Sequence, residues 1–259
     1  MSAAETIIIN SRLHLNHNHN MQELLSQLKT LRLSGMSRSL EAMATTRQQH
    51  ELNLLDGLAL LLQAEEEERD HKRFDRLIKN ARFRYQASLE ELHIDAARGI
   101  DKTLITELAS NAYIRAGMPV LVEGATGTGK SFLISALGHQ ACAGGYKVAY
   151  YNLQKLLLRI KLTRLDGSIY KFLEKLSRTD LLILDDFGLA HLDQQQRLDL
   201  MEIIEDRHGK AATVIASQLP IGSWYEVIGD DVIADGILDR LVHGAYKITL
   251  KGDSLRKKR

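Results

Sequence analysis

The chain has 259 residues, of which 44% are hydrophobic and 26% are charged, an ordinary composition for a soluble globular protein. Its single cysteine, Cys142, excludes an internal disulfide and fits a reducing compartment. A net charge of +1 gives no indication of a nucleic-acid partner. No apolar run is long enough to span a bilayer, so we expect a cytoplasmic protein with no membrane partner.

The first third of the chain has a helical pattern. Residues 1–20 are polar, and we expect a flexible tail there. Leucines at helical spacing follow Glu23, and a second, longer helix runs from Leu54 through four consecutive glutamates into a basic stretch. We expect three parts: a tail over 1–20, an all-helical N-terminal domain over 21–87, and a nucleotide-binding domain over 88–259.

The basic stretch has two interpretations. Runs of charge are usually the solvated face of a helix, and taken alone we favour that interpretation here. The alternative is a contact with the phosphate backbone of DNA. The candidate DNA-binding residues are Arg69, Lys72, Arg73, Arg76, Lys79, Arg82 and Arg84.

From Ser88 onward, helices and strands are predicted to alternate. Ser88 and Glu91 form the capping pattern of a short helix that ends at Gly99, and another helix is expected over Lys102–Arg115. Alternation of this kind is typical of an α/β fold with a parallel sheet wrapped by helices. The expected strands are Val120–Val122, Lys147–Tyr151, Leu181–Leu184, Thr213–Ala216 and Tyr246–Leu250.

A phosphate loop follows the first strand and opens a helix at Lys130. Its glycines let backbone N–H groups approach a triphosphate, and the helix N-terminus favours the same anion. Lys130 would reach the β- and γ-phosphates of ATP, and Ser131 would bind Mg²⁺. The candidate ATP-binding residues are Gly124, Ala125, Thr126, Gly127, Thr128, Gly129, Lys130, Ser131 and Phe132.

Two acids end the apolar strand Leu181–Leu184. Carboxylates at the carboxyl end of a buried strand are costly unless a cation meets them, and ligands bind at that edge of α/β sheets. Asp185 is the candidate Mg²⁺ ligand, and Asp186 is the candidate that orients or deprotonates the attacking water.

Three further residues are candidates for catalysis. Ser217 or Gln218, at the end of the fourth strand, could touch the γ-phosphate or the water, although a structural turn before Pro220 is an equal alternative. Arg240 lies on a helix with apolar neighbours; it is either an arginine that stabilises phosphoryl charge across a subunit contact or a partner of an acid in its own chain.

These motifs together resemble the IstB-like ATP-binding proteins, which are AAA+ transposition helpers related to the DnaC helicase loaders. The resemblance rests on Gly124–Ser131, Leu181–Gly188, Ala216–Pro220, the segment around Arg240 and the closing Leu250–Lys258, and it extends to Leu61–Arg69 near the start. It covers most of the chain.

The resemblance implies an AAA+ fold without a full C-terminal lid. It also implies a homo-oligomer on duplex DNA with ATP sites at subunit interfaces, and recruitment and stimulation of a cognate transposase at the target site. By the same resemblance, Arg240 is the finger that reaches a neighbouring site, and Arg256 is a second nucleotide sensor. Asp186 departs from the glutamate that is usual in AAA+ proteins, which implies slow turnover.

Three other functions remain open at this point. A DnaC-like helicase loader would share the ATPase core and differ in its partner. A small-molecule kinase built on the same loop would need an acceptor pocket and an arginine-rich lid, which the sequence does not indicate. A nucleotide switch without hydrolysis would release no phosphate.

Overall fold

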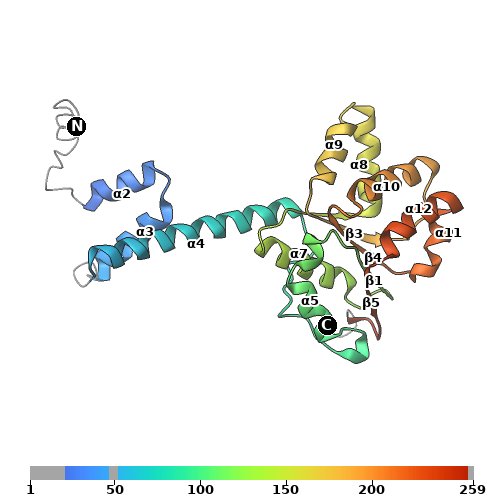
Figure 1. Ribbon diagram of the computed structural model, residues 1–259, viewed down its shortest axis with the longest axis horizontal. Helices are drawn as coiled ribbons and strands as arrows, with labels where there is room; N and C mark the ends of the chain where they lie inside the picture. Colours follow the sequence, from blue (N-terminus) through green and yellow to red (C-terminus); the bar gives the residue numbers. More distant parts are fainter. Residues whose placement is uncertain (1–20, 47–51, 256–259) are drawn as a thin grey trace. The chain divides into compact units, whose positions relative to one another are not determined.

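The structure, a computed structural model, describes residues 21–46 and 52–255. The chain divides between Arg73 and Phe74 into two compact units. The first unit contains α2 (Met21–Thr30), α3 (Ser34–Thr46) and α4 (Leu54–Ala81) as far as Arg73. The last turns of α4 and everything after them belong to the second unit (Figure 1). The predicted tail lies outside the described residues, and the predicted domain boundary at 87 stays a prediction.

In the first unit, a buried glutamate of α4 holds the start of α3. The Glu65 carboxylate accepts hydrogen bonds from the backbone N–H of Gly35 at 2.8 Å and of Met36 at 3.3 Å. Arg69 Nε lies 2.8 Å from the same carboxylate. A Cβ on Gly35 would lie 2.2 Å from the Ala64 carbonyl oxygen, so only glycine allows this approach. The Leu61–Arg69 segment that carries part of the resemblance therefore has a structural role here.

The second unit is built on a five-stranded parallel sheet in the order β2-β3-β4-β1-β5. All five predicted strands are confirmed, with β4 inserted between β1 and β3. Their bounds are β1 Val120–Gly124, β2 Val148–Asn152, β3 Leu181–Phe187, β4 Ala212–Ser217 and β5 Tyr246–Leu250.

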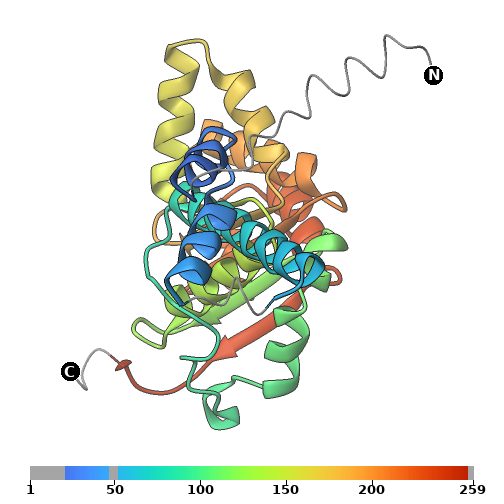
Figure 2. The same cartoon turned by 90° about the vertical axis from the view of Figure 1, so that its left-hand side faces the viewer.

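Helices cover both faces of this sheet, because alternate side chains of the buried strands point to opposite sides (Figures 1 and 2). Leu182 and Leu184 of β3 pack in one core cluster, while Leu181 and Ile183 pack in the other. The helices of the first cluster are α8 (Leu153–Leu165), α9 (Ile169–Ser177), α10 (Gln194–Arg207), α11 (Trp224–Ile228) and α12 (Asp231–Val242). Those of the second are α5 (Lys102–Ala109), α6 (Ala112–Arg115) and α7 (Lys130–Ala143).

Two helical predictions differ from the structure, and the helix α3 was not predicted. The helix expected over Lys102–Arg115 is two helices, because Asn111 has the left-handed φ of 59° and ends the run. The helix expected after Ser88 is a turn that keeps the Ser88 N–H to Glu91 hydrogen bond, and only the 3₁₀ turn η2 (Ala96–Arg98) follows. The helix α3 has few apolar residues, and these give a weak helical pattern in the sequence.

No helix within the described ranges is both long and apolar enough to span a membrane. Cys142 is buried in α7, and burial raises the pKa of its thiol to about 12. The cysteine is therefore a packing residue.

Candidate nucleotide site

The predicted phosphate loop connects β1 to α7, and its glycines adopt backbone conformations that other residues rarely reach. Gly127 and Gly129 have φ angles of 85° and 103°. A Cβ on Gly127 would lie 2.1 Å from the Ser254 hydroxyl oxygen, because the segment after β5 lies against the loop. The Leu255 N–H also donates a 3.0 Å hydrogen bond to the Gly127 carbonyl. Glycine is therefore required by both the backbone and the packing.

The ammonium of Lys130 is held at the loop by the carbonyls of the loop itself. Its Nζ donates hydrogen bonds of 2.6 Å to the Gly124 carbonyl and 2.9 Å to the Ala125 carbonyl. The Thr128 hydroxyl donates to the Ala125 carbonyl at 2.9 Å. A buried ammonium and the N-terminus of α7 thus meet at one loop, and both favour a bound anion.

The two acids that end β3 are brought together by an irregularity in the sheet. Neighbouring strand residues normally point to opposite faces. Here the pairing of β3 with β4 shifts between Leu184 and Phe187, and Asp186 adopts a left-handed φ of 59°. The Asp186 N–H donates a 2.9 Å hydrogen bond to Asp185 Oδ1. Both carboxylates consequently serve one site, although the side chain of Asp185 is almost fully buried.

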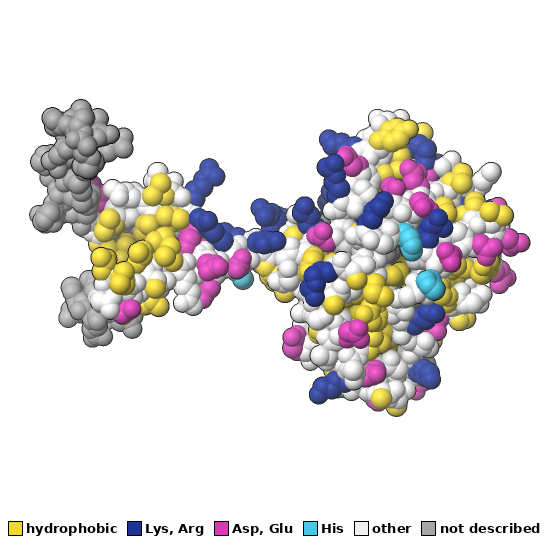
Figure 3. Space-filling view, viewed as in Figure 1, with side chains coloured by type: hydrophobic (Ala, Val, Ile, Leu, Met, Phe, Trp, Pro, Cys, Tyr) yellow, Lys and Arg dark blue, Asp and Glu magenta, His cyan; other side chains and the backbone are white. Residues whose placement is uncertain are grey.

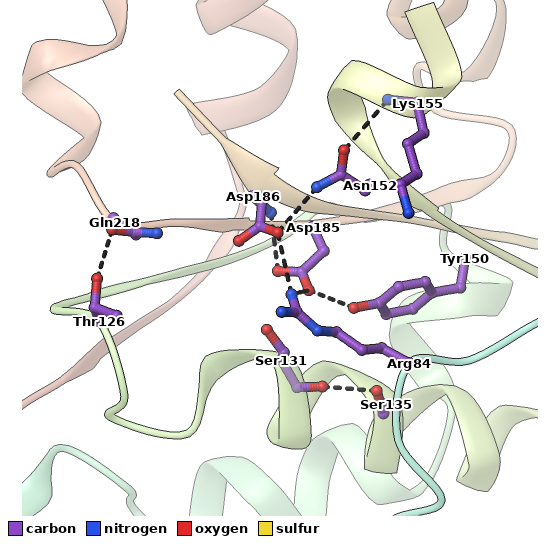
Figure 4. A network of polar contacts seen from close by, with 10 residues as sticks. All are labelled: Arg84, Thr126, Ser131, Ser135, Tyr150, Asn152, Lys155, Asp185, Asp186 and Gln218. Atoms are coloured by element: carbon purple, nitrogen blue, oxygen red, sulfur yellow. Dashed lines mark hydrogen bonds and ion pairs between the residues drawn. The ribbon is translucent and has the colours of Figure 1, made fainter. Parts of the chain in front are cut away.

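Arg84 joins the two acids (Figure 4). Its Nη1 lies 3.3 Å from Asp185 Oδ2 and 3.1 Å from Asp186 Oδ2. The hydroxyl of Tyr150 donates to Asp185, and Asn152 Nδ2 donates to Asp186 at 2.9 Å. Partial burial lowers the pKa of Arg84, but the charge of Asp186 and further groups raise it more, so its pKa is above the usual value. The guanidinium therefore stays protonated and places a positive charge beside the two carboxylates.

Phe83 fixes the segment that carries Arg84. Its ring lies over His139 of α7, with 4.5 Å between the ring centroids, and meets Tyr150 edge-on at 6.2 Å. A Cβ on Gly138 would lie 2.3 Å from Phe83 Cε1, so the missing side chain leaves the space that the ring fills. This packing holds Arg84 within reach of the acids.

The two sensor candidates at the end of β4 have different surroundings. Ser217 is fully buried, and its hydroxyl donates to the Phe187 carbonyl at 2.9 Å and accepts from the Leu219 N–H at 3.0 Å. Those bonds shape the turn. Gln218 faces the phosphate loop instead, where its Oε1 accepts a 2.6 Å hydrogen bond from the Thr126 hydroxyl. Of the two candidates, Gln218 is therefore the one whose side chain meets the phosphate loop.

A cavity of about 760 Å³ lies at this edge of the sheet, large enough for a nucleotide. Residues from the phosphate loop, the strand ends and the segment after α4 line it. They are Arg84, Tyr85, Gln86, Thr126, Gly127, Gly129, Lys130, Ser131, Phe132, Asp186, Leu189, Gln218 and Leu255.

The family model described as "IstB-like ATP binding protein" matches residues 26–259. The chain belongs to this family. A protein of Sinorhizobium fredii named as an insertion sequence ATP-binding protein is 39% identical over 233 residues, which cover 90% of this chain and 95% of that protein. The insertion sequence IS1162 ATP-binding protein of Pseudomonas fluorescens is 44% identical over 200 residues, covering 77% of this chain and 87% of that one.

Solved structures agree with the fold of this IstB-like protein. The DnaC helicase loader superposes with a TM-score of 0.55 at 19% identity, covering 64% of this chain and 98% of that one. AMPPCP-bound DnaA from Aquifex aeolicus superposes with a TM-score of 0.55 at 20% identity, covering 68% of this chain and 53% of that one. The predicted AAA+ fold, with its parallel sheet and N-terminal helices, is confirmed.

The residues at the cavity fit the ATP that the family binds. The loop offers an ammonium, glycine backbone and a helix N-terminus to phosphates. Ser131, Asp185 and Asp186 offer hydroxyl and carboxylate oxygens, the ligands that Mg²⁺ prefers when it is bound together with substrate phosphates. When bound, Mg²⁺ would neutralise phosphate charge. Asp185 and Ser131 are the residues that would hold it.

Of the remaining predicted site residues, Arg240 lies away from this cavity. Arg240 lies on α12, where it pairs with Glu205 of α10 and donates a 2.8 Å hydrogen bond to the Gly236 carbonyl. It does not line the cavity of its own chain. Arg256 lies outside the described residues.

The candidate DNA-binding residues separate into groups. In the first unit, Arg69 and Lys72 pair with Glu65 and Glu68, although both basic side chains remain largely exposed. In the second unit, Arg76, Lys79 and Arg82 are exposed. Basic side chains are visible along α4 in Figure 3. Arg84 differs from the rest, because its guanidinium contacts the acids of β3.

Two residues of the site were not predicted from the sequence, and a third was assigned to a different role. Tyr150 and Asn152 end β2, whose pairing puts Asn152 beside Asp185. A polar residue at the end of a strand neighbouring β3 was the available signal. For Arg84 no signal was available, since it resembles the other six basic residues of its stretch.

Proposed function

We propose that this IstB-like protein is an ATPase that assembles on duplex DNA and recruits and stimulates a transposase. One observation carries the proposal: Lys130, Gln218 and Asp186, whose N–H bonds to Asp185, meet at one cavity, in a chain whose relatives are named for insertion sequences. Family membership accounts for ATP binding. Hydrolysis, assembly and the partner are the proposed steps.

For hydrolysis, each group has one role. Lys130 and the loop N–H groups bind the phosphates, and Ser131 with Asp185 binds Mg²⁺. Asp186 accepts a proton from the attacking water or orients it. Gln218, which already contacts Thr126 of the loop, positions the γ-phosphate or the water. Because aspartate is one methylene shorter than the usual glutamate, we expect slow turnover that DNA or the partner stimulates.

For assembly, the ATP site is proposed to lie at a subunit interface. Arg240 does not line the cavity in its own chain. In an oligomer, it would break its ion pair with Glu205 and contact the phosphates in the ATP site of the neighbouring subunit. The proposed DNA contacts are Arg69, Lys72 and Arg73 of the first unit and Arg76, Lys79 and Arg82 of the second. Arg84 is left out of this set because of its contact with the acids.

Lys130→Ala tests the proposal. The variant is expected to lose ATP binding together with ATP-dependent assembly on duplex DNA, measured by fluorescent nucleotide titration and by electron microscopy. Lys171→Ala, at an exposed position of α9, is the matched control and should behave as wild type. Wild-type protein that coats DNA equally with and without nucleotide would contradict the proposal.

The partner is tested separately. A pull-down with the transposase of the same insertion sequence should recover a complex that depends on ATP. Recovery of a replicative helicase in its place would identify the protein as a helicase loader. The likeness to DnaC does not decide between them, since it shows the fold alone.

A further inference from the structure

Arg84 occupies the region in which a metal ion would meet the acids. Its Nη1 contacts both Asp185 and Asp186, at 3.3 and 3.1 Å. Figure 4 shows the guanidinium reaching toward these acids from the side of Ser131, the first residue after Lys130 in α7. Ser131 and Asp185 are also the residues proposed to hold Mg²⁺. One cation of the chain and one cation of the nucleotide therefore have one ligand in common, Asp185.

Asp185 and Asp186 need a neighbouring positive charge both with and without bound nucleotide. The Asp185 side chain is 1% exposed and lies beside a second carboxylate, and two neighbouring negative charges in a buried place are unfavourable without a counter-charge. Tyr150 and the Asp186 N–H give Asp185 hydrogen bonds but no charge. Arg84 supplies that charge from a side chain that is 41% exposed, so water can replace its contacts when it leaves.

We propose that Arg84 and the Mg²⁺ of the bound nucleotide compete for Asp185, so that nucleotide loading releases Arg84 from the acid pair. This inference rests on the proposed ATP–Mg²⁺ site. The release changes the contacts of the segment that follows α4, because Arg84 stands three residues after the end of that helix at Ala81. The contacts of the segment between α4 and β1 therefore depend on whether nucleotide is bound.

The test is the Mg²⁺ dependence of nucleotide binding. A fluorescent ADP is titrated onto the full chain over a range of Mg²⁺ concentrations, for wild type, Arg84→Gln and Arg84→Lys. Arg84→Gln keeps a polar side chain and removes the competing charge. The Mg²⁺ concentration at half-saturation should fall about three- to tenfold, in line with a partly screened charge interaction. Arg84→Lys should lie between Arg84→Gln and wild type.

Arg178→Gln is the matched control, since Arg178 is an exposed arginine at the end of α9 that does not line the cavity, and its half-saturation should equal that of wild type. A second measurement is the rise in melting temperature when Mg²⁺ and ADP are added. This rise should be larger for Arg84→Gln than for wild type, because in the nucleotide-free variant no arginine neutralises Asp185 and Asp186. Circular dichroism confirms that the variants fold.

Equal half-saturation for wild type and Arg84→Gln overturns the competition, as does an increase for the variant. Failure of the proposed function is distinguishable. If no form of the protein hydrolyses ATP or assembles on DNA, the ATPase proposal fails while the Mg²⁺ titrations still report on Arg84.

Discussion

The Thr126 hydroxyl donates a 2.6 Å hydrogen bond to Gln218 Oε1, across 92 residues of sequence. This bond connects the phosphate loop after β1 to the end of β4. Because β4 lies between β1 and β3, Gln218 stands between the loop and the two acids. We therefore expect the Gln218 side chain to contact a bound phosphate or the attacking water.

Gln218→Ala is therefore expected to slow hydrolysis while nucleotide affinity stays within a few-fold of wild type. Loss of one positioning group at a reaction centre costs on the order of 10- to 100-fold in turnover, and we expect a loss in this range. Phosphate release at saturating ATP, with DNA and partner present, measures it. Ser217→Ala is the control, because it should lower stability through its lost bonds to Phe187 and Leu219 and spare turnover. The reverse pattern would assign the role to Ser217.

Arg240→Ala should keep nucleotide binding and lose at least about tenfold of the stimulated turnover, as expected for an arginine that acts on a neighbouring site. Mixing experiments give the sharper measurement. An Arg240→Ala subunit has an intact ATP site, and a Lys130→Ala subunit has an intact Arg240, so the mixture should recover part of the activity that each lacks alone. Glu205→Gln removes the internal partner of Arg240 and should remain active. A mixture without recovery would remove Arg240 from the neighbouring site.

Gly138→Ala should destabilise the second unit by about 1–3 kcal/mol, because the new methyl group collides with Phe83 and Ile183. Urea unfolding followed by the fluorescence of Trp224 measures the change. Gly222→Ala is the matched control in the same unit; apart from its chain neighbours, no atom of the described residues lies within 4 Å of its added Cβ, so it should stabilise by about 0.4–1 kcal/mol. Displacement of Phe83 should also loosen Arg84 and shift the Mg²⁺ dependence as Arg84→Gln does. Unchanged stability would show that the ring moves freely.

Glu65→Gln should weaken the first unit by about 1–3 kcal/mol at neutral pH, since the charged carboxylate holds the start of α3. Burial raises the pKa of Glu65, but hydrogen bonds from Arg69, Gly35 and Met36 lower it more, and the net pKa is below the usual 4.5. Its contribution is therefore complete above about pH 4.5 and is lost as the pH falls through the lower folded pKa.

The measurement is the helical circular dichroism signal in urea over pH 3–7, about the range in which carboxylates titrate. Wild type should lose stability at the acid end, and Glu65→Gln should lack that step. Glu66→Gln, at an exposed neighbouring position, should follow wild type within about 0.5 kcal/mol. Equal acid sensitivity in Glu65→Gln would assign the step to another group.

The contiguous features could be predicted from the sequence alone. Gly124–Ser131 and the Leu181–Asp186 strand each contain their whole signal within a few residues, and alternating helices and strands were sufficient for the parallel sheet. The sequence pattern did not predict the break between α5 and α6, which depends on the left-handed backbone of Asn111. It also did not predict α3, which has few apolar residues.

Tertiary structure alone decided which side chains meet. The position of β4 between β1 and β3, the shifted pairing that turns Asp186 beside Asp185, and the packing of Phe83 against Gly138 join residues far apart in the chain. Arg84 contacts acids that lie more than a hundred residues further along, while its basic neighbours face solvent. The physical reason is that residue type and spacing fix local conformation, whereas the direction of a side chain depends on what packs around it.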